Sequence, residues 1–242
     1  MKKTTKRSKK QKKLRIGNFW MAGCIGCLLE IFNVQDGTLD FMDYIDIIDF
    51  DLIQEKNIEG PFDVAFVEGA ITNKKEEEEL RKIRKESKIL VALGSCACFG
   101  GISGLKNFVR GRPFGTAKPL YKFVKVDYRL RGCPISRKEF IELVKHLKRG
   151  LPYRENTSPV CTECPLKGDD CFLKKGIPCM GPITAAGCDA ICMKNGQACE
   201  GCRGPIPNAN ISKLFQMFEK FGMKPRDIRK KFRKFAGNAF GE

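Results

Sequence analysis

Histidine is nearly absent from this 242-residue sequence, in which His146 is the only one. Catalytic dyads of the Ser–His or Cys–His type need an imidazole beside the nucleophile, so we expect no such centre. The sequence also lacks the glycine patterns of a phosphate-binding P-loop and of a dinucleotide-binding fold. We therefore do not expect the chain to turn over a substrate by itself.

Long apolar runs are missing as well. No stretch approaches the ~20 residues of a membrane-spanning helix, and no apolar segment of the secretory type follows the basic start of the sequence. We expect a cytoplasmic protein with no membrane partner. Cysteines in that reducing compartment are more often metal ligands than disulfides.

The positive charge is concentrated at the start of the sequence. Eight of the seventeen net positive charges lie in residues 1–13, and such a run is typical of a disordered basic arm. The remainder of the chain carries a net charge of +9. We favour solubility or contact with an acidic partner as the role of this arm, and nucleic-acid binding remains the alternative.

Beyond the arm, two regions differ in composition and in hydrophobic periodicity. Residues 14–150 alternate apolar runs with helix-like segments, which predicts an α/β domain with a parallel sheet. In this region Ser136 and Glu139 form a capping-box pattern at the start of a helix. Residues 151–242 are rich in Cys, Gly and Pro as far as residue 207 and predict an irregular, metal-organised domain that ends in helices. The expected strands are Leu14–Met21, Tyr44–Phe50, Phe62–Glu68, Ile89–Gly94 and Phe123–Leu130, and the expected helices of the α/β region are Cys27–Gln35, Lys74–Ser87 and Ser136–Arg149.

Thirteen cysteines are far more than packing requires in a chain of this length. Cys24, Cys27, Cys96 and Cys133 each follow an expected strand and have glycine neighbours. Because the carboxyl ends of parallel strands meet at one edge of the sheet, these four thiols should converge there. Soft thiolates in this arrangement are typical of an iron–sulfur cluster.

Two further residues lie at the same edge. Cys98 is the odd thirteenth cysteine, and we expect it to be a buried or supporting thiol, although it could replace Cys96 as the ligand. Glu68 ends an expected strand beside the clustered thiols. Its carboxylate either caps a turn or has an interface or proton-handling role.

A second group of eight cysteines extends from Cys161 to Cys202 with the spacing C-x2-C-x6-C-x7-C-x8-C-x3-C-x6-C-x2-C. Eight thiols provide two sets of four ligands, and the glycines and prolines between them allow the tight turns that enclose a cluster. Two zinc sites are the structural alternative, because four-cysteine spacing alone does not exclude them. Three redox centres would make an electron relay.

With these motifs assembled, the sequence resembles the small subunit of [NiFe] hydrogenases, and most of all their cytoplasmic branch. The resemblance extends from about Leu14 to Pro205 and includes Val67-Glu68-Gly69-Ala70, Gly94-Ser95-Cys96-Ala97, Gly132-Cys133-Pro134 and the end of the second cysteine group. It implies a flavodoxin-like domain, an active site on a separate large subunit, and a flavin- or ferredoxin-type partner.

The resemblance also implies how three [4Fe-4S] clusters share twelve cysteines. Cys192 would provide a fourth medial thiolate, and Cys161 stands where many relatives have a distal histidine. The implied proximal ligands are Cys24, Cys27, Cys96 and Cys133, the medial ligands are Cys188, Cys192, Cys199 and Cys202, and the distal ligands are Cys161, Cys164, Cys171 and Cys179.

Three other functions remain open. A quinone-side subunit of the respiratory complex I type shares the flavodoxin-like domain, but such subunits carry adjacent cysteines in the first motif and lack the eight-cysteine extension. A related redox subunit could serve a complex without hydrogen chemistry. A zinc-stabilised module could bind nucleic acid through the basic arm.

Overall fold

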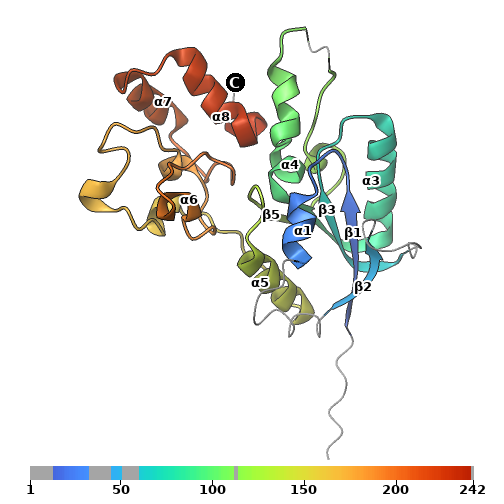
Figure 1. Cartoon of the computed structure of the whole chain (residues 1–242). Coiled ribbons are helices and arrows are strands. Elements are labelled where there is room, and N and C mark those ends of the chain that lie inside the picture. The colour runs from blue at the N-terminus through green and yellow to red at the C-terminus, as the bar shows by residue number, and fades with distance from the viewer. Residues whose placement is uncertain (1–12, 33–44, 51–59, 112–113, 241–242) are drawn as a thin grey trace, which may run out of the picture.

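Five parallel strands form one sheet in the order β2-β1-β3-β4-β5 (Figure 1). The structure is a computed structural model and describes residues 13–32, 45–50, 60–111 and 114–240. This strand order is that of flavodoxin-like doubly wound sheets, so the predicted α/β fold class is confirmed. The strands are β1 (Leu14–Trp20), β2 (Ile45–Phe50), β3 (Phe62–Glu68), β4 (Ser87–Leu93) and β5 (Tyr128–Leu130).

Helices cover both faces of the sheet. Along β3, Val64 and Phe66 pack with α1 (Gly26–Phe32) and α5 (Arg137–Lys148). The alternate residues Ala65 and Val67 belong to the cluster that contains buried residues of α3 (Lys74–Glu86) and α4 (Gly94–Phe99). Because successive side chains of a strand point to opposite faces, a continuous apolar strand needs a cover on both sides.

Local capping explains where two of these helices begin. Asn73 accepts the N–H of Glu76 at the start of α3, at 3.0 Å. Ser136 accepts the N–H of Glu139 at the start of α5, at 3.5 Å, which agrees with the predicted cap. The carboxylate of Glu139 turns instead to Arg203, whose Nη2 donates to Oε1 over 2.7 Å.

One predicted strand was mostly wrong. Of the range Phe123–Leu130, only Tyr128–Leu130 is strand. The N–H groups of Phe123 and Val124 both donate to the carbonyl of Leu120, so the chain turns before β5 begins. The other strands and helices agree with prediction to within two residues where the structure describes them, and Tyr44 and 33–35 lie outside the described residues.

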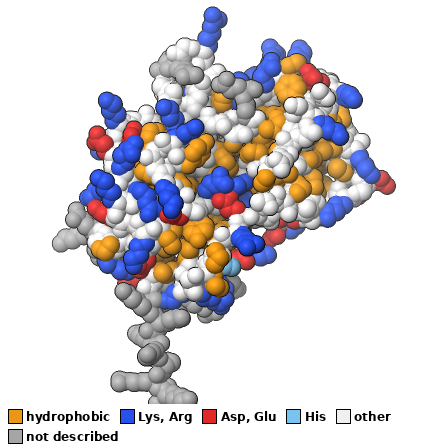
Figure 2. All heavy atoms as spheres, turned by 180° about the vertical axis from the view of Figure 1, so that it is seen from behind, with side chains coloured by type: hydrophobic (Ala, Val, Ile, Leu, Met, Phe, Trp, Pro, Cys, Tyr) orange, Lys and Arg blue, Asp and Glu red, His pale blue; other side chains and the backbone are white. Residues whose placement is uncertain are grey.

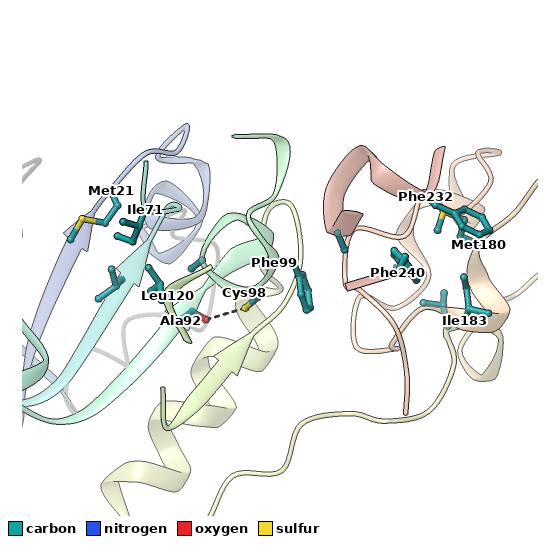
Figure 3. Packing of buried hydrophobic residues seen from close by; sticks show 14 of the residues in the cluster. Met21, Ile71, Ala92, Cys98, Phe99, Leu120, Met180, Ile183, Phe232 and Phe240 are labelled. Atoms are coloured by element: carbon teal, nitrogen blue, oxygen red, sulfur yellow. Dashed lines mark hydrogen bonds between the residues drawn. The ribbon is translucent and has the colours of Figure 1, made fainter. Parts of the chain in front are cut away.

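The region after residue 150 is largely irregular, as predicted, and packs on the α4 side of the sheet domain. Its helices are α6 (Ile191–Lys194), α7 (Ile211–Lys220) and α8 (Pro225–Phe240). Met180, Phe232 and Phe240 belong to the same buried cluster as Cys98 and Phe99, and Figure 3 shows both groups. Short 3₁₀ helices cover Ile102–Phe108, Leu120–Lys122, Val160–Thr162, Gly168–Asp170 and Gly181–Ile183.

Charged and apolar side chains are mixed on the surface. On the face in Figure 2, apolar patches are interrupted and bordered by Lys and Arg side chains. Among the described helices, none has the length and apolar character needed to cross a bilayer.

Candidate iron–sulfur sites

The first four candidate thiols lie at the carboxyl-terminal edge of the sheet. Cys24 and Cys27 follow β1, Cys96 lies on α4 directly after β4, and Cys133 follows β5. Burial, and then the negative charges of Cys202, Cys96 and Cys24, raises the pKa of Cys133 to about 12. Burial also raises the pKa of Cys27, followed by the charges of Glu68, Cys133 and Cys96. The fold therefore brings together four thiols that are widely separated in the sequence.

Glycines form a tight cradle around these sulfurs. A Cβ atom on Gly94 would overlap the sulfur of Cys27, and one on Gly101 would overlap the sulfur of Cys96. Both glycines have positive φ angles, +81° and +53°, which a side chain would strain. The backbone can thus approach the thiols closely, as a cluster with N–H···S contacts requires.

Main-chain donors are already directed at two of the four sulfurs. The N–H groups of Ile102 and Ser103 donate to Cys96, and that of Ile135 donates to Cys27. Such donors favour negative charge on sulfur, whereas burial disfavours it. The positively charged iron–sulfide core of a bound cluster would offset the cost of burying the thiolates. Four thiols, small neighbours and directed N–H groups fit a [4Fe-4S] cluster held by Cys24, Cys27, Cys96 and Cys133.

Glu68 is inside this site and is 1% exposed. Its Oε2 accepts the N–H of Leu28 at 2.8 Å, and the carboxylate also bonds the backbone and thiol of Cys27. Burial raises the pKa of Glu68, while these hydrogen bonds lower it. These contacts hold the first turn of α1, which carries Cys27, so they match the turn-capping role. The interface or proton-handling role stays a prediction.

Cys98 lies apart from the other thiols. On a helix, residues two positions apart point in different directions, and Cys96 and Cys98 are both on α4. The Cys98 side chain is 1% exposed, with its sulfur 3.6 Å from the carbonyl oxygen of Ala92 (Figure 3) and 3.8 Å from that of Leu130. Burial raises its pKa to about 12. Cys98 therefore has the position of a packing residue.

The implied medial thiols share one cavity. Cys188, Cys192, Cys199 and Cys202 line a cavity of about 1220 Å³, together with Cys133 of the first set. Burial raises the pKa of Cys202, and the N–H of Cys133 lowers it by donating to this sulfur. The hydroxyl of Ser95 reaches the carbonyl oxygens of Gly132 and Cys202. The first two thiol sets are therefore in direct contact.

The implied distal thiols also converge. Cys161, Cys164, Cys171 and Cys179 line a small apolar pocket with Phe172, Leu173 and Met193. Burial, and then the charges of the other three thiols, raises the pKa of Cys161 to about 11. The N–H of Cys199 donates to the sulfur of Cys179 at 3.3 Å. One N–H···S contact thus links the medial and distal sets, just as Cys133 and Cys202 link the proximal and medial sets.

The charged side chains around the medial thiols were not given roles from the sequence. Glu163 accepts the backbone N–H of Cys188. Burial, and then the charge of Glu163, raises the pKa of Cys188 to about 11, while the buried guanidinium of Arg203 opposes the rise. The available signal was position, since Glu163 lies inside a C-x2-C pair and Arg203 follows a cysteine. His146, the only histidine of the sequence, has its Nδ1 2.8 Å from the carbonyl oxygen of Glu142.

The described side chains do not form a single-ion site. No group of three or more Cys, His, Asp or Glu residues among them is arranged to hold one metal ion. Four thiols around zinc each lie ~2.3 Å from the ion, whereas a cube of iron and sulfide holds its ligands farther apart. Iron and zinc analysis separates these two possibilities.

Comparison with known proteins shows the family to which the chain belongs. Residues 24–147 match the family model of the NADH ubiquinone oxidoreductase 20 kDa subunit. The chain is 34% identical over 237 residues to sulfhydrogenase 2 subunit delta of Pyrococcus furiosus, covering 92% of this chain and 99% of the relative. It is 30% identical over 235 residues to a vhu subunit of the F420-non-reducing hydrogenase of Methanocaldococcus jannaschii, covering 79% and 82% of the two chains.

Solved structures agree on the fold. A chain of the Ni-Fe-Se hydrogenase from Desulfomicrobium baculatum aligns with a TM-score of 0.64 at 21% identity, over 81% of this chain and 96% of that one. A chain of an NAD+-reducing [NiFe]-hydrogenase aligns with a TM-score of 0.52 at 25% identity, over 59% and 95%.

Fold and thiol sets together define an oxidoreductase subunit of the α/β, cysteine-rich class. More particularly, the chain belongs to the NADH ubiquinone oxidoreductase 20 kDa subunit family, and its relatives include hydrogenase subunits. The predicted resemblance to hydrogenase small subunits is confirmed. The full-length match to a sulfhydrogenase subunit favours the hydrogenase branch over a quinone-side subunit.

Proposed function

We propose that this chain is the electron-transfer small subunit of a cytoplasmic [NiFe] hydrogenase. It relays electrons between a Ni–Fe site on a large subunit and a flavin- or ferredoxin-type partner. Three [4Fe-4S] clusters, when bound, each take up and release one electron. The proposed proximal, medial and distal ligands are the twelve cysteines assigned above from the resemblance.

The observation that carries this proposal is the continuity of the three thiol sets. Cys133 of the first set donates its N–H to Cys202 of the second, and Cys199 of the second donates its N–H to Cys179 of the third. A structural metal module has no need for three adjoining sites. An electron relay does, because electron transfer requires closely spaced centres.

Exposed apolar side chains beside the first set support a docked large subunit. Trp20, Leu29 and Ile102 are 43%, 60% and 45% exposed, and each lies within six residues of a proximal cysteine. Cys24 is itself exposed, and Cys133 also keeps an exposed surface although the atoms around its sulfur partly desolvate it. These side chains are available for burial against a docked subunit.

The exposed distal set supports an electron-accepting partner protein, and the state of the cysteines supports a reducing compartment. Cys161 of the distal set keeps an exposed surface although its sulfur is partly desolvated, and Ile177, near Cys179, is 41% exposed. The far end of the relay is therefore accessible to an electron-accepting protein. None of the thirteen cysteines forms a disulfide, as expected for metal ligands in a reducing compartment.

Metal and sulfide analysis of the anaerobically purified native complex tests the proposal. Three cubes predict about twelve iron and twelve sulfide per chain, with nickel from a co-purifying large subunit. Iron without nickel would keep the relay and favour a complex without hydrogen chemistry. Zinc in place of iron would refute the proposal in favour of a zinc-stabilised module.

A further inference from the structure

Glu163 lies inside the distal C-x2-C pair, yet its carboxylate reaches the medial thiols. Oε1 accepts the N–H of Cys188 at 3.1 Å and that of Ala190 at 3.2 Å. The N–H of Gly187 lies 3.1 Å from Oε1 and 3.0 Å from Oε2. The half-buried side chain of Glu163 thus connects the loop of the proposed distal cluster to Cys188, a proposed ligand of the medial cluster.

The backbone around Cys188 is shaped to hold this carboxylate. Gly187, Asp189 and Ala190 have φ angles of +116°, +52° and +50°. Left-handed conformations cost non-glycine residues ~1–2 kcal/mol each, so two such residues in succession need stabilisation. The turn directs the N–H groups of Gly187, Cys188 and Ala190 into one concave site that favours an anion. The carboxylate of Glu163 is the anion found there.

The same carboxylate contacts the thiol itself. Its Oε1 lies 3.5 Å from the sulfur of Cys188. A free thiol can donate its proton across this distance, but a sulfur bound to iron has no proton to donate. The contact then sets a negative charge against a ligand sulfur and occupies the N–H groups of Gly187 and Cys188, which could otherwise stabilise extra charge on the cluster. The N–H of Ala190 is shared between this carboxylate and the sulfur of Cys188.

Arg203 provides the opposing charge. Its guanidinium is 3% exposed and is paired with Glu139 at 2.7 Å. Burial raises the pKa of Cys188 and of Cys202, and the charge of Arg203 opposes this rise. The positive charge of Arg203 is therefore partly compensated by its own partner. Glu163 is met by main-chain N–H dipoles, which leave its net negative charge in place.

We propose that Glu163 is a positioning residue that orients Cys188 and lowers the reduction potential of the medial site. This inference rests on the proposed function, since it assumes an iron–sulfur cluster on Cys188, Cys192, Cys199 and Cys202. Its physical basis is that a fixed negative charge at the ligand disfavours the addition of an electron.

The test is a redox titration, followed by electron paramagnetic resonance, of the complete anaerobic complex carrying Glu163→Gln. Glutamine keeps the size and an accepting oxygen but removes the charge. We expect the medial potential to rise by roughly tenfold in the reduction equilibrium, or ~59 mV for one electron, with iron content unchanged. The distal potential should move less, because the carboxylate contacts Cys188. A Cys188→Ser variant identifies the medial signal.

Glu142→Gln is the matched control. Glu142 lines the same polar groove as Glu163 but is an exposed residue of α5. An unchanged medial potential in a fully loaded Glu163→Gln complex would overturn the inference, as would an equal shift in the control. If Glu163→Gln loses iron, Glu163→Asp decides: it keeps the charge, so a medial signal at wild-type potential supports the inference and a raised one overturns it. Absence of cluster signals from the wild-type complex would instead refute the proposed function.

Discussion

Replacing Gly94 with alanine should specifically damage the proximal site. Gly94 follows β4 with a φ angle of +81°, and a Cβ atom there would overlap the sulfur of Cys27. The left-handed backbone costs an alanine ~1–2 kcal/mol. Forcing a methyl group into the packed cradle costs a further ~1–3 kcal/mol. This crowding cost alone lowers the equilibrium constant for forming the proximal site by roughly 5- to 150-fold.

Gly222 offers a control that separates the two costs. Its φ angle is +84°, and nothing lies within 4 Å of a Cβ built there. The Gly222→Ala variant therefore carries the same backbone strain without the overlap at a sulfur. Any difference between the two variants measures the cost of crowding Cys27.

The assay is iron and acid-labile sulfide per chain in the anaerobically purified complex, with paramagnetic resonance of the reduced clusters. The wild type and Gly222→Ala should each hold about twelve iron atoms, whereas Gly94→Ala should hold about eight. A Gly94→Ala complex with full iron and an unchanged proximal signal would refute the role of this glycine in the cradle.

Three further substitutions test the remaining assignments. Cys133→Ser should lose the proximal cluster and hydrogen-driven dye reduction while the other two clusters assemble, and full dye reduction would contradict the proximal assignment. Cys98→Ala should keep all iron and destabilise the chain by about 1 kcal/mol through a small cavity, as measured by thermal unfolding; loss of iron would make Cys98 a ligand. Burial raises the pKa of Asp127, but the N–H of Leu90 and the guanidinium of Arg84 lower it more, so it lies below its usual value. Its stabilisation is present above the unfolded-state pKa and is lost as the pH falls through the folded-state pKa. Asp127→Asn should therefore be ~1–2 kcal/mol less stable at pH 7, and a gap that persists at a pH well below 4 would contradict this.

Local sequence was enough to predict the sheet and the positions of its thiols. The strand Phe62–Glu68 is predicted by a continuous apolar run and is observed with the same bounds. Cys24, Cys27 and Cys133 could be assigned to one edge because parallel strands end on the same side. Apolar periodicity and cysteine spacing are properties of short segments, so they can be read without knowing the rest of the structure.

Two local outcomes could not be read from the sequence pattern alone. The range Phe123–Leu130 looks like a strand in isolation, but a turn at Leu120 uses its first N–H groups. Only the helical geometry of α4 separates Cys96 from Cys98. These outcomes depend on which backbone groups find partners, and that is settled when the elements pack.

By itself, the sequence determined the number of thiols, their spacing and the α/β class. Only the tertiary structure decided that Cys133 donates to Cys202, that Cys199 donates to Cys179, and that Glu163 turns from its own loop to Cys188. The reason is physical. Ligand spacing is fixed by covalent connectivity, whereas contact between separate loops depends on how the cysteine-rich region folds against α4 and the sheet edge.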